Sequence, residues 1–231
     1  MKILLVSDFA GKVPIIPQDH LEGVDFVLLA GDITLGAKHL SSIQRGFAEA
    51  SKLFPDPTRV FYIPGNHDSP IVAQVQPWVP SNFTLMHDRS ITFNVSVFSR
   101  DILIIGFGGA KLGLYNNFAF SEEAIQDALF NLFQDVAEER LRGNLFTILL
   151  VHDPPFNTQL DFNAQQQHVG SESVRRAIET FQPDLAVSGH IHESPGIEMI
   201  GKTKCVNAGE AKYGKHAVIA VDGEEIHVEL Y

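Results

Sequence analysis

The chain alternates between short apolar runs and longer segments in which apolar residues recur every three or four positions. The runs end abruptly in polar or glycine-containing segments, which is typical of buried strands that deliver side chains from their carboxyl ends. They cover residues 3–6, 26–30, 60–63, 102–107, 146–151 and 185–187. The recurrence of apolar residues every three or four positions predicts amphipathic helices over residues 37–53, 121–140 and 171–181. This alternation indicates an α/β fold.

Polar residues mark the ends of two of these helices. Ser121 is expected to be an N-cap, because Glu122 and Glu123 follow it and their charge suits the positive end of the helix dipole. Ser171 is expected to cap the last helix, and Pro183 to follow its end.

A second group of β-like segments covers residues 90–98, 203–207, 217–221 and 225–230, with Asp222-Gly223 as a hairpin turn. Two packed sheets flanked by helices would hold both groups of strands. The sequence has no internal repeat and no Gly/Ser-rich linker. We therefore expect residues 1–231 to form a single domain.

The amino-acid composition restricts the classes of binding partner that the protein can have. Seventeen basic against twenty-eight acidic residues give a net charge of −11, and no Lys/Arg cluster marks an extended nucleic-acid surface. Bound divalent cations can reverse the sign of an acidic pocket locally, so a phosphate substrate stays compatible with this charge. Cys205 is the only cysteine, which excludes an intrachain disulfide and a thiolate zinc cluster.

The amino-terminal apolar run, residues 3–6, soon meets Asp8 and is too short for a signal peptide or a membrane span. We expect a cytoplasmic protein without a membrane partner. Nothing in the sequence sets the oligomeric state.

Residues with metal-ligand side chains follow five of the predicted strands: Asp8, Asp32, Asn66-His67-Asp68, His152 and His190-Ile191-His192. Side chains at the carboxyl ends of neighbouring strands in an open α/β sheet converge on one crevice. Carboxylate, amide oxygen and imidazole together suit Mn, Fe, Zn or a similar divalent ion. The set therefore predicts a catalytic metal site.

Each of these residues also has an ordinary structural interpretation. Asp32 could cap a turn, Asn66 could occupy a left-handed turn, and His152 could be a hydrogen-bonded core histidine. Their common position after strands favours the metal site over these separate explanations.

The elements Gly31-Asp32, Gly65-Asn66-His67-Asp68, His152 and Gly189-His190-Ile191-His192, with Asp8 before them, resemble the signature of the calcineurin-like metallophosphoesterases. The resemblance covers nearly the whole chain. It implies a four-layer αββα sandwich of two mixed β-sheets flanked by helices. It also implies a two-metal centre and the hydrolysis of phosphomonoesters or phosphodiesters by a metal-activated water.

The resemblance also assigns roles to individual residues. Asp32 would be the bridge between two ions. One or two divalent ions are expected per chain, with manganese among the candidates. One ion would have Asn66, His152 and His190 as ligands, and the other would have Asp8 and His192. His67 would be the proton donor, and Asp68 would orient it.

One residue departs from the family pattern. The first motif is Asp-x-His in the family but Asp8-Phe9-Ala10 in this chain. The tyrosine with which purple acid phosphatases replace that histidine is also missing, because its position holds Leu35. Three ligands remain for that ion, and water could complete its coordination. A one-metal enzyme and a catalytically impaired binding or scaffold module of the same fold are therefore the alternatives to a two-metal enzyme.

Three histidines, His20, His39 and His168, are unassigned candidates for the missing ligand, although surface or core positions are the more ordinary explanation for each. His168-Val169-Gly170-Ser171 resembles a segment near the pocket of some family members. Substrate specificity is expected to come from the loops 107–117 and 157–167, which carry no recognisable code for a substrate. The substrate is thus predicted only as a phosphate ester.

Overall fold

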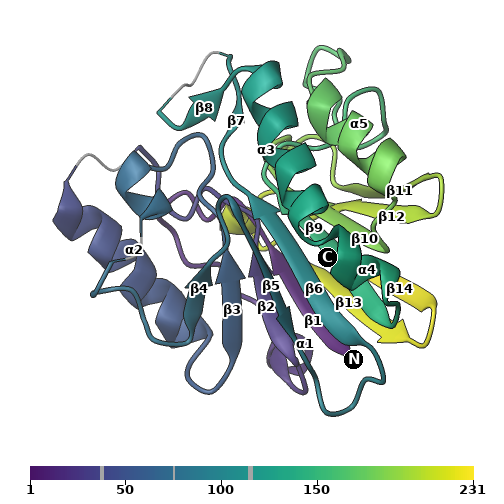
Figure 1. The fold of residues 1–231 in the computed structure, drawn as a ribbon. Helices are drawn as coiled ribbons and strands as arrows, with labels where there is room; N and C mark the ends of the chain where they lie inside the picture. Colours follow the sequence, from purple (N-terminus) through teal and green to yellow (C-terminus); the bar gives the residue numbers. More distant parts are fainter. Residues whose placement is uncertain (37–38, 75, 114–116) are drawn as a thin grey trace.

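The computed structural model describes residues 1–36, 39–74, 76–113 and 117–231, and its core is two six-stranded β-sheets packed face to face (Figure 1). The first sheet has the order β14-β13-β1-β2-β3-β4. Strands β1 to β4 are parallel, and the β13–β14 hairpin adds antiparallel to β1. The bounds are β1 Lys2–Val6, β2 Phe26–Leu29, β3 Arg59–Tyr62, β4 Phe83–Leu85, β13 Ala217–Asp222 and β14 Glu225–Leu230.

The second sheet has the order β11-β12-β10-β9-β6-β5, with four parallel strands in its middle and an antiparallel strand at each edge. Its bounds are β5 Arg89–Phe93, β6 Asp101–Phe107, β9 Leu145–Val151, β10 Leu185–Ser188, β11 Gly196–Ile200 and β12 Thr203–Asn207. A short parallel pair, β7 (Ala110–Lys111) and β8 (Ala119–Phe120), lies outside both sheets.

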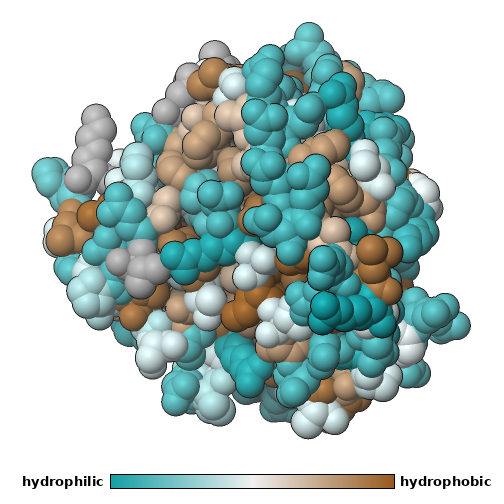
Figure 2. Space-filling view, viewed as in Figure 1, coloured by the Kyte–Doolittle hydropathy of each residue, from teal (hydrophilic) through white to brown (hydrophobic). Residues whose placement is uncertain are grey.

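Helices cover the outer faces of the two sheets. On the first sheet lies α2, with α1 at its edge, and on the second lie α3 and α5. The outer surface of α3 is hydrophilic (Figure 2). None of the helices in the described ranges is long and apolar enough to cross a membrane. The bounds are α1 Gln18–Leu21, α2 Leu40–Leu53, α3 Glu122–Asp135, α4 Ala137–Leu141 and α5 Glu172–Phe181, with short 3₁₀ helices η1 Pro70–Ala73 and η2 Ala211–Tyr213.

The continuous apolar runs are explained by burial on both faces of the strands. In β1, Ile3 and Leu5 contribute to the core between the sheets, while Leu4 and Val6 contribute to the core beneath α2. Alternate side chains of a strand point to opposite faces, so a strand between two cores must be apolar at every position. The predicted four-layer αββα sandwich of two mixed sheets is confirmed.

All six predicted apolar runs form strands, but they are divided between two sheets rather than sharing one. Both predicted N-caps are present, because Ser121 Oγ accepts from Ala124 N at 3.2 Å and Ser171 Oγ from Val174 N at 3.2 Å. The long predicted helix 121–140 is interrupted at Val136, where the backbone has φ −102° and ψ 8°. The first residues of the predicted helix 37–53, residues 37 and 38, lie outside the described ranges.

Candidate metal centre

The predicted site residues come from the carboxyl ends of both sheets. Asp8 follows β1 and Asp32 follows β2 in the first sheet, where the segment 66–68 follows β3. His152 follows β9 directly, and the segment 190–192 follows β10, both in the second sheet. The prediction that one open sheet supplies a single crevice is therefore wrong in its geometry. The crevice lies where the ends of two packed sheets meet.

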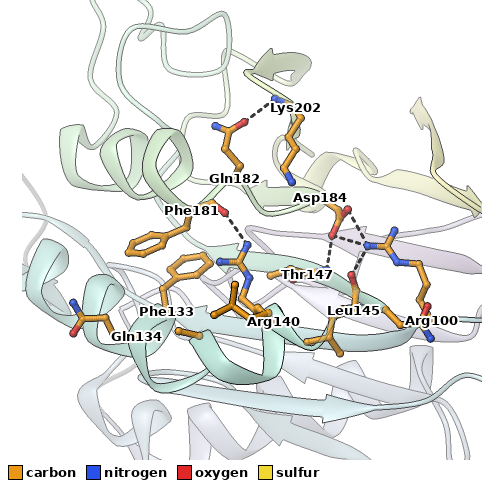
Figure 3. A pocket seen from close by; sticks show the side chains of 14 residues that line it. Arg100, Phe133, Gln134, Arg140, Leu145, Thr147, Phe181, Gln182, Asp184 and Lys202 are labelled. Carbon is orange, nitrogen blue, oxygen red and sulfur yellow. Dashed lines mark hydrogen bonds and ion pairs between the residues drawn. The ribbon is translucent and has the colours of Figure 1, made fainter.

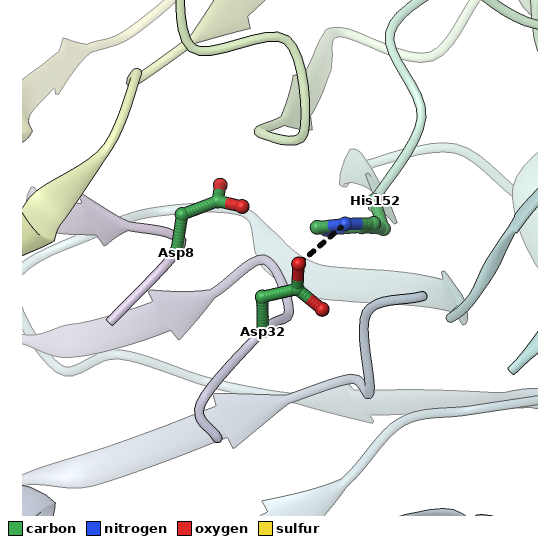
Figure 4. A group of neighbouring side chains, drawn as sticks. All are labelled: Asp8, Asp32 and His152. Atoms are coloured by element: carbon green, nitrogen blue, oxygen red, sulfur yellow. Dashed lines mark ion pairs between the residues drawn. The ribbon is translucent and has the colours of Figure 1, made fainter. Parts of the chain in front are cut away.

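Three of the predicted ligands form a compact buried group (Figure 4). Ligand atoms of Asp8, Asp32 and His152 all lie within 4.8 Å of one another. His152 Nε2 lies 3.6 Å from Asp32 Oδ2 and 3.1 Å from Asn66 Oδ1. On the other side of the ring, Nδ1 donates to the Ala30 carbonyl oxygen at 2.6 Å. That hydrogen bond fixes the imidazole so that Nε2 is the nitrogen directed at the carboxylate.

The second half of the site is organised around Asp8. His192 Nε2 lies 2.9 Å from Asp8 Oδ1, and the backbone N–H of His190 donates to Asp8 Oδ2 at 3.0 Å. The rings of His190 and His152 have centroids 4.9 Å apart. The structure thus brings Asp8, Asp32, His152, His190 and His192 together, with Asn66 bonded to His152.

The electrostatics of the buried group show how strongly its members depend on opposite charge. Burial opposes ionisation of Asp8, but the hydrogen bond from His192 and the charge of His152 bring its pKa down to about 2. Burial would lower the pKa of His152, but the charge and hydrogen bond of Asp32 raise it to about 10. Burial, followed by the charge of His152, lowers the pKa of His190 to about 3. Buried carboxylates of this kind need a cationic partner.

This donor set fits divalent metal ions. It contains oxygen and imidazole donors and no thiolate, which suits Mn, Fe or Zn in an open catalytic site. The glycines in the adjoining turns pack against the carboxylates. A Cβ at Gly65 would overlap Asp32 Oδ1, and a Cβ at Gly189 would overlap Asp8 Oδ2. The turns therefore leave space only for the ligand side chains themselves.

The backbone is strained at the same residues. Asp8, Asp32 and His190 have φ values of 62°, 52° and 65°, in the left-handed region that non-glycine residues rarely occupy. Such conformations cost about 1–3 kcal/mol each and persist where the surrounding structure enforces them. The same conformation occurs away from the site, for example at Asp88 and Asn144, so at the site it serves to turn the chain directly after a strand.

The predicted proton donor and its neighbour take different places. His67 is half-buried, and its backbone N–H donates to Asp32 Oδ1 at 2.8 Å. Asp68 is fully buried and accepts hydrogen bonds from the backbone N–H groups of Gly65, Ile33 and Thr34 and from the Thr34 hydroxyl. Burial, together with the charge of Asp32, raises the pKa of Asp68 to about 7. Asp68 therefore ties the turn after β3 to the turn after β2.

Two acidic residues at the site were not predicted from the sequence. Glu210 Oε2 lies 3.2 Å from His192 Nδ1, on the opposite side of the ring from Asp8. Asp153 Oδ2 accepts from Lys111 N at 2.6 Å, while its Oδ1 is buried, lies 3.4 Å from His190 Nε2 and has no hydrogen-bond partner among the described residues. The only sequence signal for Asp153 is its position next to His152, and Glu210 has none beyond following β12.

The three candidates for the ligand missing at Ala10 are engaged elsewhere or exposed. His20 Nδ1 lies 2.8 Å from His216 Nε2, and His168 Nδ1 lies 2.7 Å from Asp161 Oδ1. His39 is exposed at the amino end of α2. The described contacts thus give no replacement ligand among them.

A cavity of about 510 Å³ lies at the opposite, amino ends of β9 and β10 (Figure 3). Its two arginines and Asp184 already bond to the protein. Arg100 binds Asp184 at 3.2 Å and the Leu145 carbonyl, and Arg140 donates to the Phe181 carbonyl at 2.7 Å. These contacts indicate a structural role for this cavity.

Comparison with known proteins identifies the family of this chain. The family model for metallophosphoesterases of the calcineurin superfamily matches residues 48–231. The chain is 32% identical to an uncharacterized protein of Methanocaldococcus jannaschii, over 92% of this chain and 90% of that one. It is 24% identical to a probable cyclic nucleotide phosphodiesterase of Vesicomyosocius okutanii, over 77% of this chain and 66% of that one.

Among solved structures, the fold is similar to that of a dimetal phosphatase from Danio rerio. The TM-score is 0.62 at 12% sequence identity, over 100% of this chain and 95% of the other. The family match and the resemblance of the motifs agree, and the chain belongs to the calcineurin superfamily of metallophosphoesterases.

Proposed function

We propose that this protein is a metal-dependent hydrolase of phosphate esters, acting on phosphomonoesters or phosphodiesters. The observation that carries the proposal is the buried group of Asp8, Asp32 and His152, whose ligand atoms lie within 4.8 Å of one another. Family membership and the names of the phosphatase and phosphodiesterase relatives support it.

In this proposal Asp32 lies between two metal positions. Asn66, His152 and His190 would hold one ion, and Asp8 and His192 would hold the other. When bound, divalent ions would activate a water molecule and neutralise charge on the phosphoryl oxygens. The Ala30 carbonyl fixes the tautomer of His152 for this purpose, and Glu210 does the same for His192.

The protein supplies the proton for the leaving group in this proposal. The backbone N–H of His67 donates to Asp32 Oδ1, which anchors His67 next to the carboxylate that would bridge the ions. A histidine in this position can donate a proton to the departing oxygen. We assign that role to His67, with Asp68 holding the turn that carries it.

The position of Ala10 favours a specific second candidate, a binding or scaffold module with an impaired metal centre. Ala10 has φ 49° and its backbone N–H donates to the Asp32 carbonyl at 2.9 Å, so the turn keeps its shape without a ligand there. Loss of one ligand would weaken the ion held by Asp8 and His192. The presence of every other ligand of the family motifs in this chain favours the enzyme.

The test combines metal content with hydrolysis. Wild type, Asp32→Asn, Ala10→His and the exposed control Asp127→Asn are assayed for metal per chain and for hydrolysis of an aryl phosphomonoester and an aryl phosphodiester with added manganese. We expect Asp32→Asn to abolish hydrolysis and Asp127→Asn to retain it. Ala10→His is expected to raise metal content and rate. Absence of metal and turnover from both wild type and Ala10→His would support the scaffold instead.

A further inference from the structure

A cavity of about 410 Å³ opens beside the candidate metal centre and shares two of its residues, Asn66 and His190. Such a volume lies within the range of small-molecule sites in proteins. The rest of its lining combines four polar side chains, two apolar side chains and a glycine: Lys111, Leu112, Gly113, Asn163, Gln165, His168 and Val169. A phosphoryl group at the metal centre would therefore direct its organic substituent toward these side chains.

His168 is held rigidly in the wall of this cavity. Its Nδ1 lies 2.7 Å from Oδ1 of Asp161, a residue with no exposed surface. The ring of Phe162 lies against the imidazole, with centroids 4.1 Å apart. Because the carboxylate accepts a hydrogen bond from Nδ1–H, the opposite nitrogen, Nε2, is left for the cavity.

Asp161 does not depend on His168 for its own hydrogen bonding. It also accepts from the backbone N–H groups of Asn157, Thr158 and Gly170, at 3.1, 2.9 and 2.9 Å. Three backbone donors are enough to satisfy a buried carboxylate. The bond to His168 adds to this stabilisation of the carboxylate and also orients the imidazole.

A cationic side chain from another element also lines the cavity. Lys111 Nζ donates to the Gly170 carbonyl at 2.6 Å and lies 5.9 Å from the centre of the Phe156 ring. Lys111 and His168 thus face the same space from two elements, β7 and the loop after β9. In a chain with a net charge of −11, this placement of basic side chains beside the metal centre favours ligands rich in oxygen.

We propose that this cavity binds the organic group of the ester, that this group bears hydroxyls, and that His168 hydrogen-bonds one of them through Nε2. A sugar phosphate has the required chemistry. The amide of Gln165 and the imidazole of His168 can each hydrogen-bond to hydroxyls, while Leu112 and Val169 would cover the carbon skeleton. The inference rests on the proposed function for the place of the phosphoryl group.

The test uses two non-hydrolysable ligands, so that binding is measured whether or not the protein hydrolyses esters. They are the phosphonate analogue of ribose 5-phosphate and methylphosphonate, which lacks the organic group. Isothermal titration calorimetry with added manganese gives both affinities. We expect wild type to bind the sugar phosphonate more tightly than methylphosphonate.

Two substitutions separate the two nitrogens of the imidazole. His168→Asn keeps a donor near Nδ1 for Asp161 but loses Nε2, whereas His168→Gln keeps a polar atom near Nε2 but loses the bond to Asp161. We expect His168→Asn to weaken binding of the sugar phosphonate about tenfold, which is the effect of one lost hydrogen bond. Its affinity for methylphosphonate should be unchanged. His168→Gln is expected to weaken binding of the sugar phosphonate less. His227→Gln, at an exposed histidine on β14, is the matched control.

Several outcomes would overturn this inference. If His168→Asn binds the sugar phosphonate like wild type, the histidine serves only the loop. If His168→Asn weakens binding of both ligands equally, His168 acts on the phosphoryl group. If wild type does not distinguish the two ligands, the cavity does not hold the organic group. Discrimination between the ligands without hydrolysis of any ester would instead refute the proposed function alone.

Discussion

Replacing Asp68 by asparagine is expected to destabilise the fold even without metal, because this carboxylate connects two site turns. Its Oδ1 accepts from Thr34 N at 2.8 Å and from the Thr34 hydroxyl at 2.7 Å, and its Oδ2 accepts from Ile33 N at 3.2 Å and Gly65 N at 3.0 Å. An asparagine keeps the shape but turns one acceptor into a donor.

The magnitude follows from the two orientations of the new amide. With its NH₂ at the Oδ2 position, the backbone N–H groups of Ile33 and Gly65 both lose their acceptor. With its NH₂ at the Oδ1 position, the Thr34 hydroxyl can rotate to accept, and only Thr34 N is left unpaired. One unpaired buried N–H costs about 1–3 kcal/mol, so we expect Asp68→Asn to lower the free energy of unfolding by up to about that amount.

Part of this loss is offset, because the amide removes a buried charge beside Asp32. Burial and that neighbouring charge raise the pKa of Asp68 to about 7, so the carboxylate is already costly at neutral pH. Its folded pKa is raised above the ordinary 3.8, and its contribution to stability therefore falls as pH rises from about 4 to about 7. The cost of Asp68→Asn should accordingly be larger at pH 5 than at pH 8.

Urea denaturation with a chelator present measures this free energy without a contribution from metal binding. The control is Asp127→Asn, an exposed aspartate of α3, which should stay within about 0.5 kcal/mol of wild type. If Asp68→Asn is also within that margin while hydrolysis falls, the residue acts through His67 alone, and our account of the turns is wrong.

Two further substitutions test other contacts. Glu210→Gln should lower metal affinity roughly 10- to 100-fold by releasing His192, measured by competition with a chromogenic chelator, whereas the exposed Glu224→Gln should not. Glu122→Gln should cost about 1 kcal/mol at pH 7, because Glu122 accepts hydrogen bonds at the start of α5. Although burial opposes ionisation, these hydrogen bonds hold the pKa of Glu122 below 4.5. The difference in unfolding free energy between wild type and Glu122→Gln should therefore vanish as the pH falls through the folded pKa of Glu122. Urea denaturation measures this difference, with Glu123→Gln as the control.

The sequence predicts the long central strands well, because β1, β9 and their neighbours are apolar on both faces. It does not predict β11, an edge strand whose residues are mostly partly exposed, or β4, which has only 3 residues. The residues with metal-ligand side chains can be predicted from the sequence because each follows a strand. Glu210 and Asp161 are not, because their roles depend on contacts with His192 and His168 that only the pairing of strands and the folding of loops create.

The meeting of two sheet ends at the metal centre links catalysis to the packing of the whole sandwich. Asp8 and Asp32 belong to one sheet and His152 and His190 to the other. The sheets are joined by side-chain packing, such as the stacked Phe61 and Phe93 rings, and by hydrogen bonds such as that from His152 Nδ1 to the Ala30 carbonyl. A divalent ion bound by both would act as a cross-link between them. At 100 times its dissociation constant, such a ligand adds about 2.7 kcal/mol to stability. The metal would then be part of the architecture as well as of the chemistry.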